Sequence, residues 1–158
     1  MFRELTRKKQ QLSEDDCIDI LKGEKRGVLS VVGDGDYPYG MPMNHFYNED
    51  DKCIYFHCGK SGHRLDSLKK CNKASFCVYD NGYTDENEWA LNIKSVIVFG
   101  RIDIIDDADE IADVSARLSR KFTNDEDYIR QEISLYAHKT LLLRLTPEHI
   151  CGKLVKEA

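Results

Sequence analysis

The chain has 158 residues, a length at which one hydrophobic core is typical, and we expect a single domain spanning residues 1–158. It carries 28 acidic and 23 basic residues, so its formal net charge is −5, which argues against nucleic acid or an anionic membrane as a partner. No segment approaches the roughly 20 apolar residues that cross a bilayer, and residues 1–12 lack the apolar stretch of a secretory signal. We therefore expect a cytoplasmic protein whose six cysteines are reduced thiols.

The first half of the chain predicts an antiparallel meander flanked by two short helices. Ser13 suits the N-cap of a helix that ends near Gly23, because acidic residues and then apolar residues at helical spacing follow it. The three predicted strands are residues 27–32, 40–47 and 53–57. The turns between them are too short for parallel crossovers. Leu65 and Leu68 then lie on one side of a short amphipathic helix.

The second half of the chain predicts three more strands and two more helices. The strands are residues 74–79, 90–105 and 140–145. Apolar residues at spacings of three and four predict one helix from Asp107 to Phe122, and a further helix around Ile129, Ile133 and Tyr136. Six strands joined mostly by short turns indicate a closed or nearly closed antiparallel barrel with peripheral helices. Periodicity alone is equally compatible with an open α+β sheet.

The most distinctive chemistry lies in the segment His57–Arg64, where a predicted strand ends and a helix begins. Two glycines let the backbone turn closely, and Lys60, Ser61, His63 and Arg64 place donors at the helix N-terminus. Phosphate binding needs this combination of free backbone N–H groups, a hydroxyl and a guanidinium. A solvated basic turn is the competing interpretation, and the local sequence alone favours it slightly.

The same region does not predict a metal site. Cys53, His57, Cys58 and His63 lack the paired spacing of zinc ligands, and we expect structural cysteines instead. The signatures of hydrolases are also missing, including Gly-x-Ser-x-Gly and His-Glu-x-x-His. If the protein is an enzyme, a bound cofactor therefore carries the reaction.

Two other segments have unusual residues for their predicted strands. Ser95 places a hydroxyl beside a strongly apolar run, where it needs a partner from a ligand or from the backbone. The run Met41–Asn44 contains a proline, which cannot donate a hydrogen bond to a central strand ladder. An irregular edge facing a flat ligand would explain this run, as would an ordinary bulge.

Taken together, three segments resemble the pyridoxamine 5′-phosphate oxidase-related flavoproteins. The segments are Gly35–Asn44, Ile54–Asp66 and Ser95–Arg101, and their order and spacing carry the resemblance. Within these proteins, the nitroimidazole-resistance (Nim-type) branch is the most similar. The resemblance runs from Arg7–Lys9 near the N-terminus to Ile150–Lys153 near the C-terminus.

The resemblance implies a mainly β fold, a six-stranded antiparallel split β-barrel with peripheral α-helices. It also implies a homodimer that holds FMN in two equivalent clefts at the subunit interface. The residues that it places at the FMN phosphate are Gly59, Lys60, Ser61, Gly62, His63, Arg64, Ser95 and Val96. Those that it places along the isoalloxazine ring are Met41, Pro42, Met43 and Asn44. Lys153 would complete the site of the other subunit.

Two departures from the family pattern bear on the activity. Arg64 stands where family members often have lysine, which keeps the charge but changes its geometry. True pyridoxamine-phosphate oxidases carry an Arg-Lys pair after the turn serine and a substrate-binding arginine motif near the C-terminus. Here Gly62-His63-Arg64 follows Ser61, and Gly152-Lys153-Leu154 stands near the end. These departures argue against vitamin B6 oxidation.

The resemblance therefore implies an FMN-dependent oxidoreductase, similar to Nim-type nitroimidazole reductases, that passes electrons through flavin to a small acceptor such as a nitroaromatic. His57 is the first candidate for a role near the flavin, and a strand histidine bonded to a backbone carbonyl is an equal alternative. A non-catalytic flavin-binding or sensing protein would use the same cleft. Haem or a deazaflavin in a related split barrel is the remaining alternative.

Overall fold

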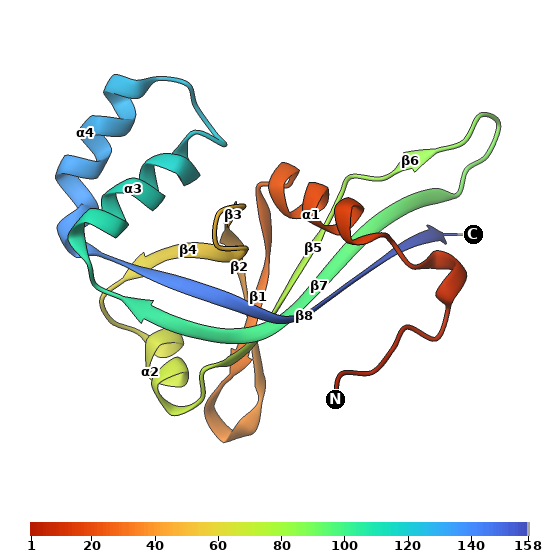
Figure 1. Cartoon of the computed structure of the whole chain (residues 1–158), viewed down its shortest axis with the longest axis horizontal. Helices are drawn as coiled ribbons and strands as arrows, with labels where there is room; N and C mark the ends of the chain where they lie inside the picture. Colours follow the sequence, from red (N-terminus) through yellow and green to blue (C-terminus); the bar gives the residue numbers. More distant parts are fainter. Residues whose placement is uncertain (158) are drawn as a thin grey trace.

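The structure is a computed structural model that describes residues 1–157, and its centre is one strongly curved antiparallel sheet (Figure 1). The strands are β1 (Arg26–Val32), β2 (Pro38–Asn44), β3 (Phe46–Asn48), β4 (Cys53–Gly59), β5 (Lys73–Tyr79), β6 (Tyr83–Thr84), β7 (Leu91–Ile105) and β8 (Thr140–Glu157). The helices are α1 (Glu14–Gly23), α2 (His63–Lys70), α3 (Ala108–Ser119) and α4 (Glu126–Tyr136). In the sheet the order is β2-β1-β5-β7-β8-β4-β3, with β6 beside β7. None of the helices within residues 1–157 is long and apolar enough to span a bilayer.

The two edges of the sheet, β2 and β3, are consecutive in the chain and are separated only by His45. Its imidazole is fully buried, and Nε2 lies 2.8 Å from the carbonyl oxygen of Leu21 in α1. β2 pairs with β1 while β3 pairs with β4, so the predicted strand over residues 40–47 is divided at this histidine. The consecutive segments are antiparallel, as predicted, and the break brings the two edges of the curled sheet together.

The inner side of the curved sheet forms the hydrophobic core. Leu29, Phe76 and Val98 are in register across β1, β5 and β7, and none of them is exposed to solvent. Burial of each such side chain stabilises the fold by about 1.5–3 kcal/mol. From α1, Cys17 and Leu21 pack into the same core. Successive side chains along each strand therefore point alternately into this core and to the opposite side of the sheet.

The opposite side of β1, β5 and β7 is apolar but uncovered, and we call it the outer face. Its central residues, in register on adjacent strands, are Val28, Cys77 and Ile97. Pro42 of β2 and Cys151 of β8 extend the same row across five strands. Val28 and Ile97 are 38% and 36% exposed, which is unusual for β-branched residues in the middle of a sheet.

The strands differ from the predicted ones in three ways. The predicted last strand ended at Leu145, but β8 continues to Glu157. Pro147 lies opposite Gly100, directly beside a shift in the β7–β8 register, and proline within a sheet is tolerated at such irregularities. The six predicted strands are otherwise present, with the second divided into β2 and β3 and the two-residue β6 added. The helix predicted to reach Phe122 ends at Ser119.

Candidate functional site

The turn between β4 and α2 contains the predicted phosphate-binding residues. Gly62 is the N-cap of α2 and has a φ of +123°, a conformation that L-residues rarely adopt. No side chain caps this helix N-terminus. The first N–H groups of an α-helix have no acceptor within the helix, so this end can donate to an anion. Ser61 is exposed directly before it.

Arg64, in the first turn of α2, is half-buried and contacts sulfur atoms. Its Nε donates to Sδ of Met41 at 3.0 Å. Burial raises the pKa of the Cys58 thiol, and the neighbouring Arg64 guanidinium partly offsets that rise. Thiol and thioether sulfurs are weak acceptors. Within residues 1–157 no carboxylate forms an ion pair with Arg64, so its guanidinium remains able to bind a stronger acceptor.

Two other side chains of the turn, Lys60 and His63, lie close to aspartates. Lys60 Nζ lies 2.8 Å from Asp106 Oδ1, across from the start of α3. His63 Nε2 lies 3.4 Å from Asp34 Oδ2, and its ring stacks on Tyr39 with the centroids 4.3 Å apart. Asp106 directly precedes Asp107, the N-cap of α3, and no local sequence pattern predicts its pairing with Lys60.

His57 lies near the end of β4, with its side chain exposed beside α4. Desolvation by its neighbours lowers the pKa of this imidazole, and the charge of Arg64 lowers it further. The ring is therefore neutral at pH 7, with one N–H donor and one acceptor nitrogen. Among the described residues, no hydrogen bond joins this ring to a backbone carbonyl. The histidine that makes such a bond is His45.

The run Met41–Asn44 presents different atoms to different sides of the sheet. Met41 and Met43 are 5% and 8% exposed and point into the core, whereas Pro42 is exposed on the outer face. Asn44 accepts a hydrogen bond at 2.9 Å from Nε of Arg26. A ligand on the outside of the barrel would therefore meet Pro42 and backbone atoms of this run.

Ser95 and Val96 lie in β7, away from the turn. Val96 is completely buried in the core, while Ser95 is on the side of the outer face and pairs with Lys153. Gly59, at the turn, pairs instead with Thr140 at the other end of β8. No hydrogen bond or ion pair within residues 1–157 joins Ser95 to the turn. Figure 1 shows α2 and β6, which lies beside the start of β7, on opposite sides of the molecule.

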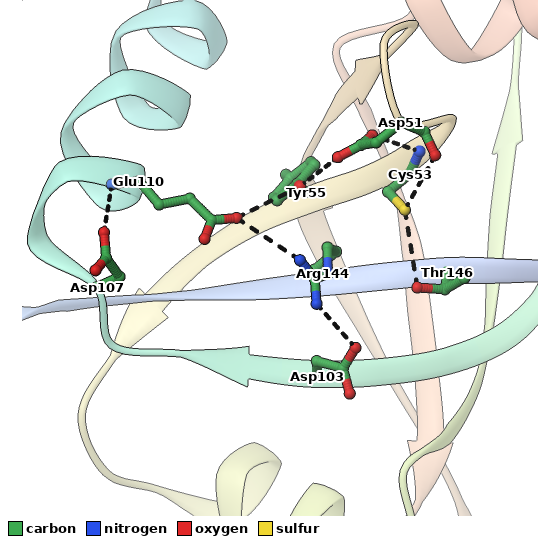
Figure 2. A network of polar contacts seen from close by, with 8 residues as sticks. All are labelled: Asp51, Cys53, Tyr55, Asp103, Asp107, Glu110, Arg144 and Thr146. Carbon is green, nitrogen blue, oxygen red and sulfur yellow. Dashed lines mark hydrogen bonds and ion pairs between the residues drawn. The ribbon is translucent and has the colours of Figure 1, made fainter.

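A polar network holds α3 against the sheet (Figure 2). The buried Tyr55 of β4 donates its hydroxyl to Asp51 at 2.6 Å and lies 3.5 Å from Glu110 of α3. Arg144 of β8 pairs with Asp103 at 3.3 Å and with Glu110 at 4.0 Å. Burial raises the pKa of the Tyr55 hydroxyl, and its bond to Asp51 raises it further, so it stays a donor. No local sequence signal predicts this network, because its members come from four separate segments.

Known protein families and structures agree with the resemblance that the sequence shows. A family model described as pyridoxamine 5′-phosphate oxidase matches residues 13–154. The chain belongs to this family. None of the curated proteins matches it significantly.

Solved structures with the same fold cover almost the whole chain. A conserved hypothetical protein from Mycobacterium tuberculosis matches with a TM-score of 0.80 at 15% identity, over 95% of this chain and 90% of that chain. A candidate 5-nitroimidazole antibiotic resistance protein from Bacteroides thetaiotaomicron has a TM-score of 0.77 at 16% identity, with 92% and 87% covered. An FAD and heme binding protein from Mycobacterium smegmatis has a TM-score of 0.71 at 20% identity, with 94% and 74% covered. These likenesses confirm the split-barrel fold with flanking helices and exclude an open α+β sheet.

Proposed function

We propose that the protein is an FMN-dependent oxidoreductase that acts as a homodimer and reduces a small acceptor such as a nitroaromatic. The observation that carries this proposal is Arg64, whose guanidinium contacts weak sulfur acceptors beside a helix N-terminus that no side chain caps. Family membership supports a flavin at this turn. Two proteins of the same fold, one named for 5-nitroimidazole resistance and one for FAD and haem binding, support the choice of chemistry.

The residues of the turn fit a single phosphate group. Arg64 would bind two phosphate oxygens through its remaining N–H groups, and the backbone N–H groups that follow Gly62 would donate to the same anion. Ser61 would add a hydroxyl donor. Because Lys60 and His63 are paired with aspartates, one free guanidinium is available, which favours the monophosphate of FMN over the diphosphate of FAD.

The chain's own contribution to the reaction is binding and orientation. When bound, FMN supplies the redox chemistry, since it can take up two electrons from a reduced nicotinamide and pass them to an acceptor. His57, neutral at pH 7, would hold a neighbouring polar atom by one hydrogen bond without adding a charge. No acid–base pair of side chains is needed for this role.

The outer face supports the homodimer. No helix of residues 1–157 covers this row of apolar side chains, which extends across five strands. In a symmetric dimer, the same face of a second copy would cover it. Ser95 and Lys153 lie on the same side of β7 and β8 as this row. In a dimer packed through this face, Ser95 and Lys153 of one chain would lie toward the β4–α2 turn of the other chain. Within one chain these two residues are far from the turn.

Anaerobic turnover tests the proposed activity. Purified protein loaded with FMN should oxidise reduced nicotinamide continuously only when 2-methyl-5-nitroimidazole or a quinone is also present, because without an acceptor oxidation stops after one equivalent per bound FMN. Free FMN at the same concentration is the control for non-enzymatic reduction. A protein that holds FMN but shows no turnover above this control with either NADH or NADPH would instead be a non-catalytic flavin-binding protein.

A further inference from the structure

A second site lies on the other side of His57, between β4 and the two helices that follow β7. It is a pocket of about 240 Å³. The side chains that define it are His57 of β4, Ser115 and Ser119 of α3, and Glu132, Ile133 and Tyr136 of α4. It is smaller than the roughly 300 Å³ at which drug-sized ligand pockets begin. A ligand here would be close to a single aromatic ring in size and could not be FMN itself.

The pocket exists because α3 presents small residues toward α4. Ser115 and Ser119 are one helical turn apart, so they lie on the same face of α3 and leave space beside it. The larger Val114 and Leu118 are buried on another face of the same helix. On its sheet side α3 is held by the Tyr55–Glu110–Arg144 network (Figure 2), so this wall of the pocket is fixed.

The charge of the pocket comes from one carboxylate. Glu132 is half-buried, and it takes part in no ion pair or side-chain hydrogen bond within residues 1–157. His57 is the other side chain of the pocket that could carry a charge near pH 7. It is neutral there, because desolvation and the charge of Arg64 lower its pKa. Ile133, Ala137 and the Tyr136 ring supply apolar surface. A half-buried carboxylate beside apolar walls favours a positively charged ligand.

We propose that this pocket binds a small flat cation, an aromatic amidine or a protonated aromatic amine, with Glu132 as its counter-ion. The cationic group lies at the Glu132 end, because Arg64 adds positive charge near His57 at the other end. The ring contacts Ile133 and Tyr136, and the serines of α3 donate or accept the remaining hydrogen bonds. This site is separate from the phosphate-binding turn, and its preference for a cation comes from Glu132, whereas His57 is the side chain that it shares with the proposed surroundings of the flavin.

A series of three probes of nearly equal shape tests the charge preference. Benzamidine, benzamide and benzoate carry charges of +1, 0 and −1 on the same ring. Each is titrated into the purified protein, with whatever flavin it contains, and followed by two-dimensional NMR of the backbone amides. Benzamidine should shift resonances of α3 and α4 and bind about tenfold or more tightly than benzamide, since a charge-assisted hydrogen bond is lost in the amide. Benzoate should cause no saturable shift.

Two variants assign the effect to this pocket. Glu132→Gln should weaken benzamidine binding by about tenfold or more and abolish the preference over benzamide. Glu86→Gln, which removes an exposed carboxylate near β6, is the matched control and should leave the affinity unchanged. Ser119→Phe should fill the pocket and abolish binding, and its NMR spectrum shows whether the fold is retained.

The proposal is overturned if benzoate binds as tightly as benzamidine, if Glu132→Gln leaves benzamidine binding unchanged, or if the shifts lie away from the residues that line the pocket. FMN binding is measured in parallel on the same variants. Glu132→Gln should not alter it, so failure of the cation site and failure of the flavin site are separate results.

Discussion

Nε of Arg64 lies 3.0 Å from Sδ of Met41, and this contact joins the turn after β4 to the middle of β2. The two residues come from different segments of the family resemblance. A thioether is a weak partner for a guanidinium, so the contact positions the Arg64 side chain without satisfying it. A phosphate at this place would replace a weak acceptor with a strong one.

Arg64→Ala should weaken FMN binding by roughly 10- to 150-fold. The reason is that a hydrogen bond between a charged donor and a phosphate contributes about 1.5–3 kcal/mol. Fluorescence titration of the flavin-free protein with FMN measures the change.

Lys60→Ala is the matched control for Arg64→Ala. Lys60 is in the same turn, but its amine is paired with Asp106 on the surface, where such pairs contribute at most about 1 kcal/mol. Its loss should change FMN affinity much less than the loss of Arg64. Equal effects of the two substitutions would show that the turn acts only through its overall charge.

Gly62→Ala should destabilise the protein by about 1–2 kcal/mol and also weaken FMN binding. There is space for the added methyl group, so the cost arises from the φ of +123°. Gly59→Ala in the same turn has space as well and needs no positive φ, and it should be close to neutral. Urea unfolding and FMN titration of both variants make the comparison. If both glycines behave alike, backbone conformation at Gly62 is not what shapes the turn.

Ile97→Glu should convert the proposed dimer into monomers and reduce FMN retention. The substitution places a charge in the middle of the apolar row on the outer face. Ile104→Glu is the control, because Ile104 is in the same strand and is 37% exposed, against 36% for Ile97. Size-exclusion chromatography with light scattering measures the mass. A dimer that survives Ile97→Glu would place the interface elsewhere.

The stability of the protein should fall between pH 6.5 and pH 4 partly because of His45. Burial, and then the charge of Lys121, lowers the pKa of His45 to about 4. In that pH range the unfolded chain takes up a proton that the folded chain refuses, so stability is lost as the pH falls, by at most about 3 kcal/mol. Urea unfolding across the range should show a shallower pH dependence for His45→Gln than for the parent. A variant whose stability falls with pH as steeply as that of the parent would show that His45 is not responsible.

Local sequence patterns predicted the elements well, because they depend on neighbouring residues. The β-branched run of β1, the N-cap at Ser13 and the glycine-containing turn before α2 all have local causes. The break at His45 has no such signal. It depends on a hydrogen bond to Leu21, a residue of α1 that is 24 positions earlier in the chain.

The candidate site was predicted less completely, because its contacts join residues that are far apart in the sequence. Lys60 and Arg64 are equivalent cations in the sequence, and only the fold pairs one of them with Asp106. The resemblance places Met41 and Met43 along a flavin ring, and the structure adds that the period-two pattern of β2 directs both side chains into the core. The pocket around Glu132 also depends on how α4 packs against α3, which periodicity does not specify.

The most direct test of the central claim is the absorbance spectrum of the purified protein after incubation with FMN and removal of the unbound flavin. We expect a yellow protein with the bands of oxidised flavin and one FMN per chain, which is released on denaturation and identified by its mass. A colourless protein that takes up no FMN, or one with the spectrum of haem, would contradict it.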